Sequence, residues 1–297
     1  MGITLEFLDR LRDNGLLEKG NKILDIGSSN LYQVQLEHVR DFISHYLPTK
    51  SGSEVEKFAS RIVEGSSYDA DKGGSNGAFA GELLDCCGIN YTSLDIAVGY
   101  KTKIFDLNRD RLPKTLRGAF DAVLNIGTTE HVLNQYNSFQ VIHDATRVGG
   151  CIVHQLPTAG FTDHGYFIYT GRLLFDLVGY NGYEIVDIWY DGPVGEDDLY
   201  TSVRAYKTLF PKLVELAAAS PVRVPNCALT VIMRKTKDAP FVACLETSTG
   251  VGEIPLKVRS NYSYSAGFGA KVRAAASAVA PDALVKWLGR LKGFRKH

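Results

Sequence analysis

Apolar residues follow two spacings along the chain, and together these predict alternating strands and helices. Short apolar runs bounded by glycine or polar residues predict buried strands at Lys22–Gly27, Tyr91–Ile96, Lys103–Leu107, Phe120–Ile126, Cys151–Leu156, Tyr183–Tyr190 and Ala228–Arg234. Apolar residues three or four apart predict helices at 3–17, Leu31–Leu47, Glu54–Val63, Ala78–Cys87, Ser138–Arg147 and Gly171–Val178. This alternation indicates an α/β fold with a mostly parallel sheet. The last two strands lack a simple crossover helix and are expected to pair as an antiparallel edge.

Other segments depart from this alternation. The connection 191–226 contains a helical piece at Tyr200–Ala218, and 240–270 is irregular. Asp282–Phe294 places apolar side chains on one helical face and Lys or Arg elsewhere, which predicts a basic amphipathic helix. That helix packs on the body, or it contacts a membrane surface or a protein partner. We therefore divide the chain into a main domain, 1–239, and a C-terminal extension, 240–297.

Composition narrows the class of protein. The 297 residues are 45% apolar and 22% charged, with zero formal net charge, so no overall field favours nucleic acid. The segment 257–297 nevertheless holds nine Lys or Arg and one acid. Five cysteines without a CxxC pattern indicate reduced thiols. With no signal-peptide pattern and no run of about 18 apolar residues, we expect a cytoplasmic protein without a membrane-spanning helix.

Acidic residues stand at the ends of successive predicted strands. Ligands of open α/β sheets bind beyond the carboxyl ends of the strands, near the point where strand order reverses. Asp25 and Gly27 end the first strand, and Gly27 permits close backbone approach. Asp95 ends the second, where a carboxylate can accept hydrogen bonds from a ribose diol. Asp106 ends the third, where a carboxylate can accept from an adenine amine.

The fourth strand ends in a polar stretch, Asn125-Ile-Gly-Thr-Thr-Glu-His-Val132. Burying these side chains without partners would be costly, so we expect the stretch to line the cleft. His131 here and His164 after the fifth strand are candidate general bases, because imidazole titrates near neutral pH. A structural role for each histidine is an alternative.

Taken in order, these segments resemble the motif set of class I S-adenosylmethionine-dependent methyltransferases. The resemblance rests on Leu24-Asp-Ile-Gly27, Leu94-Asp-Ile96, Phe105-Asp-Leu-Asn108, Phe120-Asp-Ala-Val123 with Glu130-His-Val132, and Arg147-Val-Gly-Gly150. The resemblance covers about 22–234. A little-characterised bacterial subgroup of that family is also similar in two segments, Gly127–Val132 and Asp163–Tyr166. The resemblance implies a Rossmann-like seven-stranded sheet with an antiparallel last strand and helices on both faces. The long gap after the first strand implies an inserted helical cap at 31–77, over the substrate.

Carried over by position, the resemblance assigns roles to individual residues. The cofactor-binding set is Asp25, Gly27 and Ser28 for the methionine part of S-adenosylmethionine, Asp95 and Ile96 for the ribose, Asp106 and Leu107 for adenine, and Asn125 and Gly127 beside the sulfonium. His131, His164 and Glu130 form the catalytic set, and Thr128, Thr129, Tyr166 and Tyr169 the substrate-binding set. Core packing is the alternative for both tyrosines.

Glu130, His131 and His164 are also metal-ligand types. The Glu-His pair resembles one in metal-assisted O-methyltransferases of quinone biosynthesis. Those enzymes carry another Glu three positions before this one, where Gly127 stands here, so we expect no metal.

The favoured function is methyl transfer to a small hydroxylated acceptor, such as a sugar or glycan precursor. One alternative is a nicotinamide-dependent oxidoreductase, against which the missing G-x-G-x-x-G pattern argues. The other is a non-catalytic partner-binding module, against which Asp95 and Asp106 argue.

Overall fold

The computed structural model describes residues 2–32, 34–48, 52–66, 76–161, 164–191 and 226–245. All of them belong to one compact unit, Met1–Pro255. The predicted helices at 200–218 and 282–294 lie outside the described residues, as does most of the predicted irregular segment 240–270. The predicted domain boundary at 239 stays a prediction.

Within the described residues, seven strands form one sheet in the order β5-β4-β2-β6-β7-β9-β8. They are β2 (Lys22–Ile26), β4 (Asn90–Asp95), β5 (Thr102–Ile104), β6 (Phe120–Ile126), β7 (Thr146–Ala159), β8 (Tyr183–Asp191) and β9 (Cys227–Lys235). Strand β9 runs antiparallel to β7 and β8, and the other neighbouring pairs are parallel. Strand order reverses between β2 and β6, which confirms the predicted Rossmann-like α/β fold.

The last two strands, β8 and β9, form an antiparallel pair at one edge of the sheet, as the sequence suggested. Strand β9 lies between β7 and β8, and β8 is the edge strand. Seven consecutive residues of β9, from Cys227 to Met233, are buried, which a strand needs when both faces and both sides are covered. The predicted antiparallel pairing of the last two strands is confirmed.

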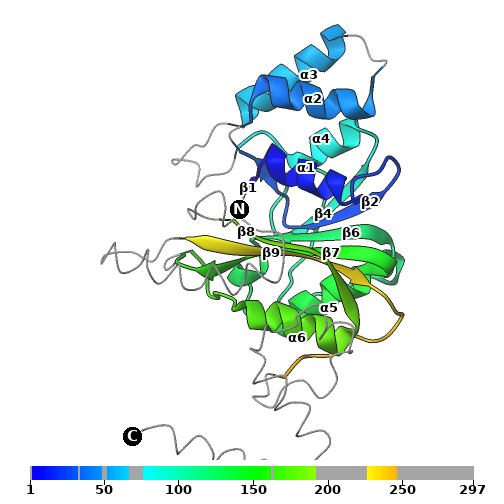
Figure 1. Cartoon of the computed structure of the whole chain (residues 1–297), viewed down its shortest axis with the longest axis vertical. Helices are drawn as coiled ribbons and strands as arrows, with labels where there is room; N and C mark the ends of the chain where they lie inside the picture. The colour runs from blue at the N-terminus through cyan, green and yellow to red at the C-terminus, as the bar shows by residue number, and fades with distance from the viewer. Residues whose placement is uncertain are drawn as a thin grey trace, which may run out of the picture. The chain divides into compact units, whose positions relative to one another are not determined.

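Helices cover both faces of the sheet (Figure 1). Helices α1 (Leu5–Asp13) and α4 (Ala80–Cys86) lie on one face, and α5 (Gln135–Ala145) and α6 (Gly171–Asn181) lie on the other. In α1, the Thr4 side chain caps the first turn by accepting from the backbone N–H of Phe7. The apolar stripe of α1 is buried in the core beneath it, as its spacing predicts.

The predicted insertion contains two helices, α2 (Leu36–Tyr46) and α3 (Gly52–Gly65), stacked beyond α1 and α4 (Figure 1). The Arg40 guanidinium pairs with the Glu56 carboxylate and joins them. Phe42 is buried in the same core as α1, and the Tyr46 hydroxyl donates to Leu17 O at 2.8 Å. These contacts extend the helical layer, and a role as a cap over substrate stays a prediction.

Several predicted boundaries move for identifiable reasons. Gly2–Ile3 (β1) pairs with Asn30–Leu31 (β3) in a small parallel sheet, so the first helix begins at Leu5 and the second at Leu36. Tertiary pairing here overrides helical spacing. Helix α5 begins at Gln135, before the predicted Ser138, because the Asn134 side chain caps it. Strand β7 begins at Thr146, before the predicted Cys151, because Thr146 already pairs with Phe120.

Two bulk features of the sequence also have a counterpart in the structure. All five cysteines are free thiols. Among the described residues, no helix has the length and hydropathy needed to cross a membrane.

Candidate functional site

The ends of β2 and β6 meet at the carboxyl edge of the sheet, beside the reversal of strand order. Gly27 has a φ of +96°, which side-chain-bearing residues rarely adopt. A Cβ on Gly27 would lie 2.5 Å from Thr128 Oγ1. The bare backbone of Gly27 therefore lets the two strand ends approach closely, and its predicted approach to a ligand stays a prediction.

Asp95 at the end of β4 faces the same exit. Its Oδ2 accepts from the backbone N–H of Ser28 at 3.0 Å, and its Oδ1 accepts from that of Ala97 at 3.0 Å. An ionised carboxylate has about four acceptor positions, so two remain for another donor. The side chain of Ile96 next to it is 75% exposed and offers an apolar surface.

Asp25 lies beneath this edge rather than at its surface. Its Oδ2 accepts from the Ser29 N–H at 2.9 Å and from the Tyr91 hydroxyl at 2.7 Å. Oδ1 has no hydrogen-bond partner among the described residues. Burial, partly opposed by the hydrogen bonds from Tyr91 and Ser29, raises the pKa of Asp25 to about 6. Asp25 thus orders the turn after β2 from below.

Asp106 and Leu107 follow β5 on the next tip. The Phe105 N–H donates to Asp95 O at 2.8 Å, which joins this tip to β4. The Asp106 carboxylate accepts from the Asn108 N–H at 2.8 Å. Leu107 is buried. Asp95 and Asp106, the residues predicted to bind a nucleoside, therefore follow neighbouring strands, β4 and β5, as the sequence indicated.

Three predicted site residues are internal. The Asn125 amide donates to Thr129 Oγ1 at 2.9 Å and to His154 Nδ1 at 3.0 Å. The Tyr169 hydroxyl donates to Gln135 Oε1 at 2.7 Å. All of these side chains except that of Gln135 are buried, and the network holds the 3-10 turn Thr129–His131. For Tyr169 the structure matches the core-packing alternative, and Asn125 and Thr129 present no free polar group to a ligand.

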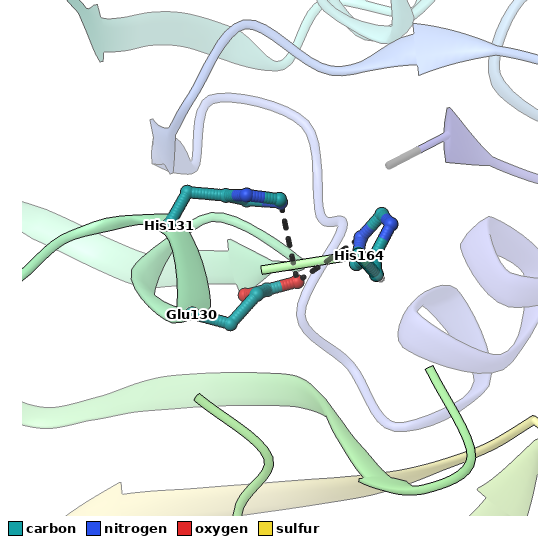
Figure 2. A group of neighbouring side chains, drawn as sticks. All are labelled: Glu130, His131 and His164. Carbon is teal, nitrogen blue, oxygen red and sulfur yellow. Dashed lines mark ion pairs between the residues drawn. The ribbon is translucent and has the colours of Figure 1, made fainter. Parts of the chain in front are cut away.

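Glu130, His131 and His164 come together at the tip of β6 (Figure 2). Glu130 is completely buried, and neither carboxylate oxygen has a hydrogen-bond partner among the described residues. The Nε2 atoms of His131 and His164 lie 3.9 and 3.7 Å from Glu130 Oε1. The rings are 4.8 Å apart, edge to face. The three predicted catalytic residues thus form one cluster, which we call the Glu130 cluster.

Burial sets the electrostatics of this cluster. Desolvation raises the pKa of Glu130 from 4.5 to about 7. Desolvation, followed by the neighbouring His164, lowers the pKa of His131, and desolvation lowers that of His164. Both imidazoles are therefore neutral at neutral pH and can each offer a nitrogen lone pair.

Backbone contacts hold His164 in the cluster. The N–H groups of Tyr166 and Phe167 donate to Glu130 O at 2.8 and 3.2 Å. A Cβ on Gly165 would lie 3.0 Å from both Glu130 Cγ and Glu130 O. Tyr166 itself is 75% exposed. The segment 164–167 is thus tied to the 3-10 turn, and Gly165 permits the close approach.

Four contributing residues were not predicted from the sequence. Tyr91 holds Asp25, Gln135 holds Tyr169, and Gly165 admits the histidine segment. A Cβ on Gly99 would lie 2.3 Å from Ser28 Oγ. The one sequence signal that could have indicated such a residue is a glycine next to a candidate site residue. Gly165, next to His164, has this signal.

No model of a protein family and no curated protein matches the chain. Solved structures that match include a SAM-dependent methyltransferase from Archaeoglobus fulgidus, with 14% identity over 78% of this chain and 94% of that chain, at a TM-score of 0.40. A phosphoethanolamine N-methyltransferase 2 from Haemonchus contortus, complexed with phosphomonomethylethanolamine and S-adenosylhomocysteine, matches with 11% identity over 77% of this chain and 52% of that chain, at a TM-score of 0.41. The [4+2]-cyclase SpnF matches with 11% identity over 78% and 81%, at a TM-score of 0.37. These values are too low to bear on function, which has to be argued from the site.

Proposed function

We propose that this protein is an S-adenosylmethionine-dependent methyltransferase that acts on a hydroxyl group of a small acceptor, such as a sugar or glycan precursor. The observation that carries the proposal is the placement of Asp95 beside Gly27 at the reversal of strand order. A nucleoside ligand needs a diol acceptor next to bare backbone at this point of a doubly wound sheet.

The other residues at this edge fit the same ligand. Asp95 keeps acceptor positions for a ribose diol, and the exposed Ile96 offers an apolar surface to adenine beside Asp106 and Leu107. Asp25 holds Ser29 from below, so the turn after β2 is ordered before any ligand arrives. When bound, S-adenosylmethionine supplies a methyl group on a positively charged sulfur.

The Glu130 cluster would act on the acceptor. As the acceptor oxygen bonds to the methyl carbon, the carbon–sulfur bond breaks and its electron pair stays on sulfur. The hydroxyl proton passes to the neutral imidazole of His131, or of His164 beside it. Glu130 Oε1, 3.9 and 3.7 Å from the two Nε2 atoms, would stabilise the charge that forms on the imidazole.

Calorimetric titration tests the nucleoside site. We expect S-adenosylhomocysteine to bind with one-to-one stoichiometry and NADH to show no heat of binding. Binding of NADH without S-adenosylhomocysteine would favour the oxidoreductase alternative, and binding of neither would overturn the proposal. Candidate sugars would then be screened for methyl transfer with radiolabelled S-adenosylmethionine.

A further inference from the structure

The Glu130 carboxylate is a buried acid that no described residue satisfies. Its side chain is completely buried, yet both oxygens lack a hydrogen-bond partner among the described residues. An unpaired polar group of this kind costs free energy and commonly marks the place of an ion or ordered water. Among the residues that the structure describes, only the two histidine side chains approach Oε1 as ion partners, and neither is within hydrogen-bond distance.

The separations in the cluster suit a metal ion better than direct hydrogen bonds. Two ligands at about 2.0–2.2 Å from one ion lie at most about 4.0–4.4 Å apart. The 3.9 and 3.7 Å separations from Glu130 Oε1 to His131 and His164 fall within that limit. The candidate ligand atoms of all three residues lie within 4.8 Å of one another, so the widest separation would have to shorten by a few tenths of an ångström around an ion. Both rings point toward the carboxylate (Figure 2).

We propose that Glu130, His131 and His164 form a site for a divalent first-row transition metal. Two imidazole nitrogens and one carboxylate oxygen suit Zn²⁺, Co²⁺, Fe²⁺ or Mn²⁺, whereas Mg²⁺ and Ca²⁺ prefer oxygen ligands alone. Three protein ligands leave coordination positions open for an oxygen of a second molecule. The side chains of His131 and His164 are 44% and 35% exposed, so these positions can be reached from solvent.

The cluster forms without a carboxylate at position 127. The expectation of no metal rested on Gly127, which stands where the metal-assisted O-methyltransferases of quinone biosynthesis carry a second Glu. In the structure the three remaining ligand types meet all the same, because the bonds from Tyr166 and Phe167 to Glu130 O hold His164 beside Glu130. One consequence rests on the proposed function: an imidazole nitrogen that binds an ion cannot take a proton. The ion would instead lower the pKa of the acceptor hydroxyl, and the hydroxyl proton would pass to solvent water.

The test is a titration of the metal-stripped full-length protein with Co²⁺, followed by visible absorption, and with Zn²⁺ by calorimetry. We expect one ion per chain and no comparable heat with Mg²⁺. Glu130→Gln and His164→Ala should each weaken Co²⁺ binding by more than about tenfold. His38→Gln is the matched control, because His38 also lies beside two carboxylates, Asp9 and Glu6, but outside the cluster.

The outcomes separate the two proposals. Wild-type protein that binds no Co²⁺, or variants that bind it like the wild type, would overturn the metal site. Because His164 lies outside helices and strands, we expect His164→Ala to fold. Thermal melting checks that each variant is folded. S-adenosylhomocysteine binding is measured on the same samples. Metal binding without nucleoside binding would support this site and reject the proposed function. Nucleoside binding without metal binding would reject the metal site alone.

Discussion

Burial changes the chemistry of single side chains throughout this site. Asp25 and Glu130 are both fully buried acids, and burial raises the pKa of each, to about 6 and about 7. Asp95, only partly buried, accepts two backbone hydrogen bonds and keeps further lone pairs. The three acids therefore differ in environment: Asp25 supports a turn, Glu130 lies inside a cluster, and Asp95 keeps the acceptor positions that we propose for the ligand.

Replacing Asp95 tests the ligand-binding role. Asp95→Ala should weaken S-adenosylhomocysteine binding by more than about tenfold, because both the ribose acceptor and the bonds that order Ser28 and Ala97 are lost. Calorimetry measures the affinity. Asp13→Ala, at an exposed position on the distant end of α1, is the control and should bind like the wild type. Unchanged affinity of Asp95→Ala would remove this residue from the site.

His154 gives the fold a specific sensitivity to acid. Burial lowers its pKa from 6.5 to about 3, so the unfolded chain takes up a proton between these values and the folded chain does not. The contribution of His154 to stability is complete above pH 6.5. Below it, the contribution falls by up to about 1.4 kcal/mol per pH unit.

Chemical denaturation at several pH values measures this slope. His154→Gln, which can still accept from Asn125, should show a shallower loss of unfolding free energy between pH 6.5 and pH 5. His45→Gln, at an exposed position, should follow the wild type. Equal slopes for all three proteins would show that His154 is not the group responsible.

At the scale of elements, the site depends on how strand exits approach one another. Gly27 brings the end of β2 against Thr128 after β6, and Gly165 brings the segment 164–167 against Glu130. Each contact joins segments that are far apart in the sequence. Close backbone approach is the physical reason for glycine at both positions.

Gly27→Ala tests the β2–β6 approach. It should lower the free energy of unfolding by more than about 2 kcal/mol. The positive φ strains the alanine backbone, and a Cβ 2.5 Å from Thr128 Oγ1 overpacks the contact. Gly20→Ala is a matched control, with a φ of +86° and nothing within 4 Å of the added Cβ. It should cost only about 1 kcal/mol. Urea denaturation measures both, and equal losses would mean that the contact with Thr128 relaxes freely.

For the whole molecule, every described site residue lies within the unit Met1–Pro255. The basic helix predicted at 282–294 packs on the body, or it contacts a membrane surface or a protein partner. These alternatives stay predictions, as does cytoplasmic location. We expect a chain ending at Pro255 to bind S-adenosylhomocysteine with wild-type affinity, measured by calorimetry. A loss of affinity in a truncated chain that still melts cooperatively would place part of the tail in the site.

Local sequence pattern was enough to predict the sheet and the acids at its strand ends. Continuous apolar runs must be buried on both faces, and the polar residues that follow them must lie at the carboxyl edge, so local pattern suffices. It could not show which polar residues turn inward: Asn125 and Tyr169 have the same local signal as exposed cleft residues. The resemblance placed His164 and Glu130 in one set, but local pattern alone could not bring the two side chains together. That contact depends on backbone bonds between segments remote in the chain, and only the folded path of the chain sets such distances.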